Sequence, residues 1–187
     1  MLQLAFLLAL SLAPATETST QDPLWLSQEA LDYFEERVSP SLPPHMRLER
    51  LIETIFDESQ FNFSYKTETK TAEEVYRTRS GNCLSFTQFI IALSRHYRLD
   101  ARFREVEVAP TWSKQGELVL FNQHVNAYIV AGGGAYLIDL VPEVRRLEIT
   151  GRLISDQRAL AHFHNNLGAD WFSRGSPLTA EKSFLKA

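Results

Sequence analysis

The 187-residue sequence predicts an α+β fold in which helices come first, an antiparallel sheet follows and a helical hairpin comes last. Changes in the spacing of apolar residues indicate this order. The spacing is helical up to residue 97, alternates with a period of two from residue 102, and is helical again from about residue 157. The hydrophobic content of 44% is enough for one sizeable core.

The charge pattern argues against a nucleic-acid partner. The 23 acidic and 19 basic side chains are mixed along the chain and give a formal net charge of -4. Proteins that bind a phosphate backbone need clustered lysine and arginine side chains, and this sequence has no such stripe. We therefore expect no nucleic acid to bind.

Residues 1–15 predict a signal peptide. Leu4 to Ala13 form a short apolar run, and Ala13-Pro14-Ala15 has the small-x-small pattern of a signal-peptidase site. The run is too short for a stable membrane span. It departs from the usual signal because no Lys or Arg precedes it. We expect an exported, periplasmic protein; a buried or disordered N-terminus is the alternative.

The first part of the chain predicts helices with apolar residues at every third or fourth position. Ser27 suits the start of the first helix, and Thr71 with Glu74 three residues later forms a capping-box pattern. The predicted helices are 26–38, 45–57, 72–79 and 83–97. The last of these is apolar enough to be a well-buried helix.

Strand-like stretches follow the helices. "RFREVEV" (102–108), "ELVLFNQHVNAYIV" (117–130) and "AYLIDLV" (135–141) alternate or are rich in β-formers, with a Gly132-Gly133-Gly134 turn before the last. Pro142 ends the sheet. Together the helices and the sheet predict one domain over residues 24–150.

The tail, residues 157–187, predicts a helical hairpin. Leu167-Gly168-x2-Trp171 and Ala180-x3-Phe184 match the spacing of the tetratricopeptide consensus, although His164 stands where that consensus often has Trp. A generic hairpin with a small-residue crossing is the alternative. Because such repeats need neighbours, we expect a truncated piece of a longer array, with a protein partner bound through this tail.

Cys83 is the only cysteine of the sequence, so it cannot form an internal disulfide even in an oxidising compartment. Asn82 before it is a suitable N-cap, which places Cys83 in the first turn of a helix. The partial positive charge and free N–H groups there stabilise a thiolate. Free cysteines are also commonly buried as small hydrophobes, but the helix N-terminus favours a nucleophile.

A nucleophilic thiol needs a base, and the base needs an orienting group. Of the five histidines, His124 is in a strand, which is rigid enough to hold an imidazole against a helix N-terminus. Asp139 interrupts an apolar strand, where an acid is costly unless it is bonded, and the Nδ1–H of His124 would satisfy it. The two are directly opposite only if the hairpin is centred between Ala131 and Gly132. Centring the hairpin on Gly133 would move the partner by a few residues and change the face, and a bulge in the glycine turn could restore the register.

Three stretches together resemble the transglutaminase-like superfamily: "SGNCLSFTQFIIALSRHYRLDARFREV", "NQHVNAYIV" and "YLIDLVP". In this papain-type fold a cysteine heads a helix, and a histidine and an aspartate follow on adjacent strands. The resemblance covers residues 71–142 and is greatest to bacterial members with tetratricopeptide repeats after the domain. It implies Cys83 as nucleophile, His124 as general base and acid, and Asp139 as the group that orients the imidazole.

The implied chemistry is acyl transfer from an amide through a cysteine thioester, with a protein or peptide as substrate. Transfer to water gives a protease or amidase, and transfer to an amine gives a transglutaminase. The backbone N–H of Cys83 is the expected oxyanion donor, with Asn82, Gln123 and Trp112 as side-chain candidates. We expect no cofactor or metal, because EF-hand and zinc spacings are missing from the sequence.

The alternative from another class is a catalytically inactive transglutaminase-like module. Such a module would present the helical-repeat region to protein partners. The two hypotheses differ in the reactivity of Cys83 at mildly acidic pH, where an inert buried thiol stays protonated.

Overall fold

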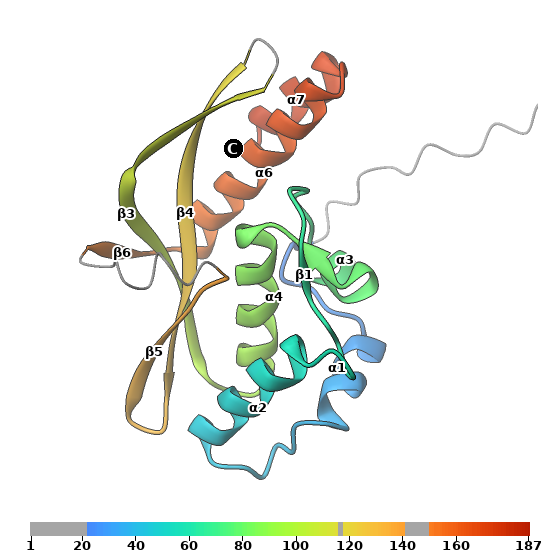
Figure 1. Cartoon of the computed structure of the whole chain (residues 1–187), viewed down its shortest axis with the longest axis vertical. Helices are drawn as coiled ribbons and strands as arrows, with labels where there is room; N and C mark the ends of the chain where they lie inside the picture. The colour runs from blue at the N-terminus through green and yellow to red at the C-terminus, as the bar shows by residue number, and fades with distance from the viewer. Residues whose placement is uncertain (1–21, 116–117, 141–149) are drawn as a thin grey trace, which may run out of the picture.

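The computed structural model describes residues 22–115, 118–140 and 150–187. Side chains are described for all of these residues except those in the range 107–123. Its elements in chain order are α1 Gln28–Glu35, α2 Pro44–Phe56, β1 Ser64–Tyr65, α3 Ala72–Thr78, β2 Ser80–Gly81, α4 Cys83–His96, β3 Asp100–Gln115, β4 Leu118–Ala131, β5 Gly134–Ile138, β6 Gly151–Ile154, α6 Asp156–Ser173 and α7 Pro177–Phe184. Helix α4 lies at the centre, with strands β3 and β4 on one side and α3 on another (Figure 1). The predicted signal peptide, 1–15, is outside the described residues.

The predicted mixture of helices and an antiparallel sheet is confirmed. The main sheet has the strand order β5-β4-β3-β6, and each neighbouring pair is antiparallel. Strand β6 was not predicted, because its four residues carry too little alternation to be recognised. Strands β1 and β2 form a separate two-stranded parallel ladder just before α4.

The predicted helix starts are confirmed at three caps. The Ser27 side chain accepts a hydrogen bond from the Ala30 N–H, and Thr71 and Glu74 form the full capping box. Asn82 caps α4, so Cys83 is the first residue of that helix. These caps are local in sequence, and their side-chain oxygens satisfy N–H groups that the first turn leaves free.

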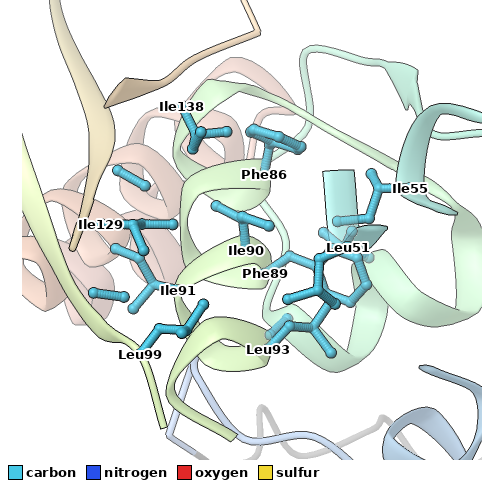
Figure 2. Close-up of a cluster of buried hydrophobic side chains, with 14 of the residues drawn as sticks. Leu51, Ile55, Phe86, Phe89, Ile90, Ile91, Leu93, Leu99, Ile129 and Ile138 are labelled. Atoms are coloured by element: carbon cyan, nitrogen blue, oxygen red, sulfur yellow. The ribbon is translucent and has the colours of Figure 1, made fainter. Parts of the chain in front are cut away.

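Helix α4 is buried on most of its surface, as its sequence predicts. Figure 2 shows its apolar side chains lying between α2 and the strands. The labelled side chains are Leu51 and Ile55 of α2; Phe86, Phe89, Ile90, Ile91 and Leu93 of α4; and Leu99, Ile129 and Ile138 beyond it. Each fully buried side chain of this size contributes about 1.5–3 kcal/mol. Contacts on opposite sides therefore fix the position of α4 and of Cys83 at its start.

The centre of the β4–β5 hairpin is one residue later than direct pairing of His124 with Asp139 requires, so the residue opposite Asp139 changes by two positions. Ala131 pairs with Gly134, and the turn residues Gly132 and Gly133 have φ of 60° and 83°. A two-residue turn with positive φ at both positions demands glycine-like residues. The hairpin is thus centred between Gly132 and Gly133, so the centre that direct opposition needed is not the one observed.

The tail forms the predicted helical hairpin, α6 and α7. A Cβ added at Gly168 of α6 would lie 2.4 Å from the ring of Phe184 on α7, so the helices meet at a small residue. That contact suits a generic hairpin as well as a tetratricopeptide unit, and the repeat assignment stays a prediction. In the part of the chain that the structure describes, no helix has the length and apolar character needed to cross a membrane.

Helix α6 is joined to the sheet through a buried carboxylate. The Glu105 side chain on β3 bonds the Arg158 Nε at 2.5 Å and the His162 Nε2 at 2.6 Å, both on α6. The Arg152 Nε on β6 donates to its other oxygen at 2.8 Å. Two guanidinium groups and one imidazole, from two elements, thus surround one carboxylate and tie α6 to the core domain.

Candidate active site

Cys83 is held at the start of α4 by a fully bonded cap. The Asn82 Oδ1 accepts the Ser85 backbone N–H at 2.9 Å, and its Nδ2 donates to the Thr69 Oγ1 at 2.8 Å and to the Thr67 carbonyl at 3.4 Å. Asn82 is buried, whereas Cys83 is partly exposed. The helix therefore presents a reachable thiol at its positively polarised end.

Gly81, two residues before Cys83, is required by close packing. A Cβ at this position would lie 2.7 Å from the Cβ of Ser85 and 3.3 Å from a methyl group of Val75. Gly81 also belongs to β2, where it pairs with Tyr65 of β1. The "SGN" sequence thus lets a short strand run directly into the capped helix.

His124 on β4 is held by Asp139. The His124 Nε2 and the Asp139 Oδ2 are 2.6 Å apart, and the two side chains are 12% and 1% exposed. The predicted bond through Nδ1 is wrong: the ring uses Nε2 for the carboxylate, which leaves Nδ1 for the thiol. The β3–β4 register becomes irregular next to the Val106–His124 pair, after Val106 on β3 and before His124 on β4.

The charge state of His124 follows from competing effects. Burial alone would lower its pKa, but hydrogen bonds with Asp139 and Cys83, together with their negative charges, outweigh it and raise the pKa to about 10. At neutral pH the ring is therefore an imidazolium. A thiol hydrogen-bonded to such a cation at a helix N-terminus is the setting in which proteins form thiolate–imidazolium pairs.

Asn126 completes the environment of Asp139, and sequence reasoning missed it. Its Nδ2 donates to the same Oδ2 atom at 3.1 Å, and both residues are buried. Continuing the β4–β5 register beyond the Ala127–Ile138 pair places Asn126 opposite Asp139. His124 reaches the carboxylate from two residues away, which keeps it on the same side of β4. The spacing of two between His124 and Asn126 was the sequence signal that could have identified Asn126.

Tyr65 on β1 is a second residue that sequence reasoning missed. It is 58% exposed, and the next residue, Lys66, donates its backbone N–H to the Gly81 carbonyl at 3.0 Å. Partial desolvation and the negative charge of Cys83 raise the pKa of Tyr65. Tyr65 is therefore close enough to Cys83 for the two side chains to interact electrostatically. Nothing in the sequence indicated this, because it depends on the β1–β2 ladder.

The candidate oxyanion donors have different outcomes. The hydrogen bonds of Asn82 occupy both of its amide hydrogens, so its side chain cannot serve as the donor. Gln123 and Trp112 fall in the range 107–123, whose side chains are not among those that the structure describes. The backbone N–H of Cys83, in the first turn of α4, remains the predicted donor.

Within residues 22–115, 118–140 and 150–187, no three His, Cys, Asp or Glu side chains are grouped so that they could bind a metal ion. His162, one of the tail histidines, is bonded to Glu105 instead.

The chain matches no protein-family model and no curated protein. Comparison with solved structures finds a similarity to the crystal structure of a candidate cysteine protease from Cytophaga hutchinsonii, with a TM-score of 0.47 and 17% sequence identity. The match covers 72% of this chain and 46% of that chain. This chain therefore spans about half the length of that protein.

Proposed function

We propose that this protein is a thiol enzyme that acts on amide bonds by acyl transfer through a cysteine thioester. The observation that carries the proposal is one imidazole, His124, hydrogen-bonded to both Cys83 and Asp139. Cys83 heads a helix, and the other two residues come from β4 and from the end of β5. A nucleophile, a base and an orienting acid are thereby assembled from three elements.

The geometry suits the following sequence of steps. The Cys83 thiolate attacks the amide carbonyl carbon, and the resulting oxyanion accepts a hydrogen bond from the Cys83 backbone N–H. His124 donates its Nδ1 proton to the leaving nitrogen, the C–N bond breaks, and a thioester and a free amine result. Water or a second amine then attacks the thioester, His124 takes up the proton, and the thiolate leaves. Asp139 holds the ring through Nε2 at every stage.

The finer assignment is to the transglutaminase-like superfamily and its papain-type fold. Its support is the order of Cys83, His124 and Asp139 along the chain and their places at a helix start, on β4 and directly after the adjacent strand β5. Export to the periplasm, proposed from residues 1–15, suits a protein or peptide substrate. The acceptor of the acyl group decides the activity. Transfer to water would make the protein a protease or amidase, and transfer to an amine would make it a transglutaminase.

A second candidate is an inactive module that binds a protein partner through its tail. The observation that favours it is an apolar groove at the α6–α7 hairpin, lined by Phe172, Ala180, Phe184 and Leu185 among others. Leu185 is 81% exposed. Apolar side chains gathered at a groove are typical of contact surfaces. The hydrogen-bonded state of His124 and Asp139 favours the enzyme, because a vestigial site has no need to keep it.

Acylation by an activated ester tests the enzyme proposal without knowledge of the substrate. Wild-type protein treated with p-nitrophenyl acetate is expected to gain one acetyl group on Cys83, detected by intact mass, and to lose it to water or to added amine. Cys83→Ser should keep the circular dichroism of the wild type and gain no acetyl group at this position. Equal acetylation of the two proteins, or none in the wild type, would leave the binding module as the better candidate.

A further inference from the structure

We infer that Asp170, on the C-terminal helix α6, orients the cap of the cysteine helix and is a positioning residue for Cys83. The inference rests on the proposed function, because it assigns Asp170 a part in holding the nucleophile. It makes α6 a component of the active site, in addition to any role in binding a partner.

Three hydrogen bonds connect the carboxylate to the first turn of α4. The Thr69 backbone N–H donates to the Asp170 Oδ2 at 3.3 Å, the Thr69 Oγ1 accepts the Asn82 Nδ2–H at 2.8 Å, and the Asn82 Oδ1 accepts the Ser85 N–H at 2.9 Å. Thr69, Asn82 and Ser85 are all buried. Cys83 lies between the last two residues of this chain of bonds, so its backbone position depends on them.

The direction of the bonds gives Asp170 its role. A side-chain amide can bind in two orientations, and only the one with Oδ1 toward Ser85 caps the helix. The Asp170 carboxylate accepts the Thr69 backbone N–H and so fixes the position of Thr69 beside Asn82. The Thr69 hydroxyl oxygen is an acceptor toward Asn82, which selects the Nδ2 end of the amide. The Thr67 carbonyl accepts the other Nδ2 hydrogen and favours the same orientation. Without the carboxylate, the Thr69 backbone N–H loses its acceptor, and the Thr69 side chain that supports the Nδ2 end of Asn82 is held less firmly.

The setting of Asp170 is costly for a carboxylate. Burial raises its pKa, and the negative charge of Glu68 adds to this effect, whereas the bonds from Thr69 and the charge of Arg174 oppose it. A half-buried acid is tolerated when its bonds to neighbouring donors compensate for lost hydration. Here those donors belong to the segment that supports the Asn82 cap.

Helix α6 also contacts the other end of α4, which provides a matched control. Asp156 at the start of α6 bonds Arg95 in the last turn of α4 through two contacts of 2.6 and 2.8 Å. Asp156 and Asp170 are about 20 Å apart along the helix, at 1.5 Å per residue. Asp156 thus attaches α6 to the last turn of α4, whereas Asp170 bonds Thr69 beside the Asn82 cap.

The test compares Asp170→Ala, Asp170→Asn and Asp156→Ala in the full chain. The readouts are hydrogen exchange of the Ser85 amide and the rate of Cys83 alkylation by iodoacetamide at pH 7, with thermal unfolding as a measure of stability. Asp170→Ala is expected to speed Ser85 exchange about fivefold and to slow alkylation about fivefold, as for a weakened N-cap. Asp170→Asn should restore most of both values, because its oxygen still accepts from Thr69. Asp156→Ala should lower stability and leave both site readouts unchanged.

The two proposals fail in distinguishable ways. Unchanged Ser85 exchange in Asp170→Ala, or the same change in Asp156→Ala, overturns the positioning role while acylation of wild-type Cys83 upholds the enzyme. If wild-type Cys83 is not acylated, the enzyme proposal fails, and the Ser85 amide still decides whether Asp170 sets the cap.

Discussion

Replacing Glu105 by Gln is expected to destabilise the protein by about 2–3 kcal/mol at pH 7. The side chain is 10% exposed and bonded to Arg158, His162 and Arg152. Burial alone would raise its pKa, but these bonds lower it from 4.5 to about 2. At 1.36 kcal/mol per pKa unit, the shift corresponds to about 3 kcal/mol, somewhat less because the partner guanidinium groups are screened by solvent. Gln keeps the shape but leaves the cations without their anion.

The pH dependence identifies the cause of the loss. The folded-state pKa of Glu105 is below its unfolded value, so its stabilisation is fully present above about pH 4.5 and is lost as the pH falls toward about 2. Urea unfolding followed by circular dichroism at pH 7, 5, 4 and 3 should therefore show a difference between wild type and Glu105→Gln that shrinks below pH 4.5.

The matched control is Asp100→Asn, also on β3. Asp100 pairs with Arg102 at 2.8 Å, but both side chains are about half exposed. Exposed pairs of this kind contribute about 0–1 kcal/mol. A loss in Glu105→Gln no greater than in Asp100→Asn, or a difference that does not change between pH 7 and 3, would refute the reasoning.

Further predictions concern the site and its support. Asp139→Asn should reduce the rate of Cys83 acetylation at least about tenfold, because the imidazole loses its orienting charge; full activity would remove that role. The folded-state pKa of His124 is raised, so its contribution to stability is complete below about pH 6.5 and is lost as the pH rises through about 10. The difference in urea midpoint between wild type and Asp139→Asn should accordingly shrink over that interval, and a constant difference would argue against the ion pair. Gly81→Ala should cost about 1–3 kcal/mol in thermal unfolding, because its Cβ would meet that of Ser85 at 2.7 Å; a variant as stable as wild type would contradict the tight packing.

The start of α4 could be predicted from sequence because its determinants are local. Asn82 caps a helix that begins one residue later, and the apolar spacing after Cys83 is dense enough to indicate burial. The capping box of Thr71 and Glu74 was predictable for the same reason. Signals that lie within four residues of one another need no knowledge of the tertiary fold.

The approach of His124 to Asp139 was predicted from the cost of a buried acid, although the register was not. The glycine run allowed several turn centres, and the observed centre makes Asn126 the residue opposite Asp139. His124 is two residues from Asn126 and therefore on the same side of β4, so its side chain still bonds Asp139. The use of Nε2 instead of Nδ1 follows from where the strands place the ring, which no sequence pattern encodes.

Contacts across long sequence separations could not be predicted. Glu105 meets its α6 partners 53 and 57 residues away, and Asp170 meets Thr69 across 101 residues. In the sequence Glu105 was one acid of an alternating strand, and Asp170 one polar residue of an amphipathic helix. Only the docking of α6 on the sheet gives these residues their partners.

The most direct test of a thiolate–imidazolium pair is the pH dependence of Cys83 alkylation by iodoacetamide in wild type and His124→Ala. An ordinary thiol titrates at about 8.5, so its alkylation falls about tenfold for each pH unit below that value. We predict that wild-type Cys83 stays reactive down to pH 6, and that His124→Ala shows the profile of an ordinary thiol. A wild-type profile that rises only above pH 8 and does not change in His124→Ala would contradict the proposed active site.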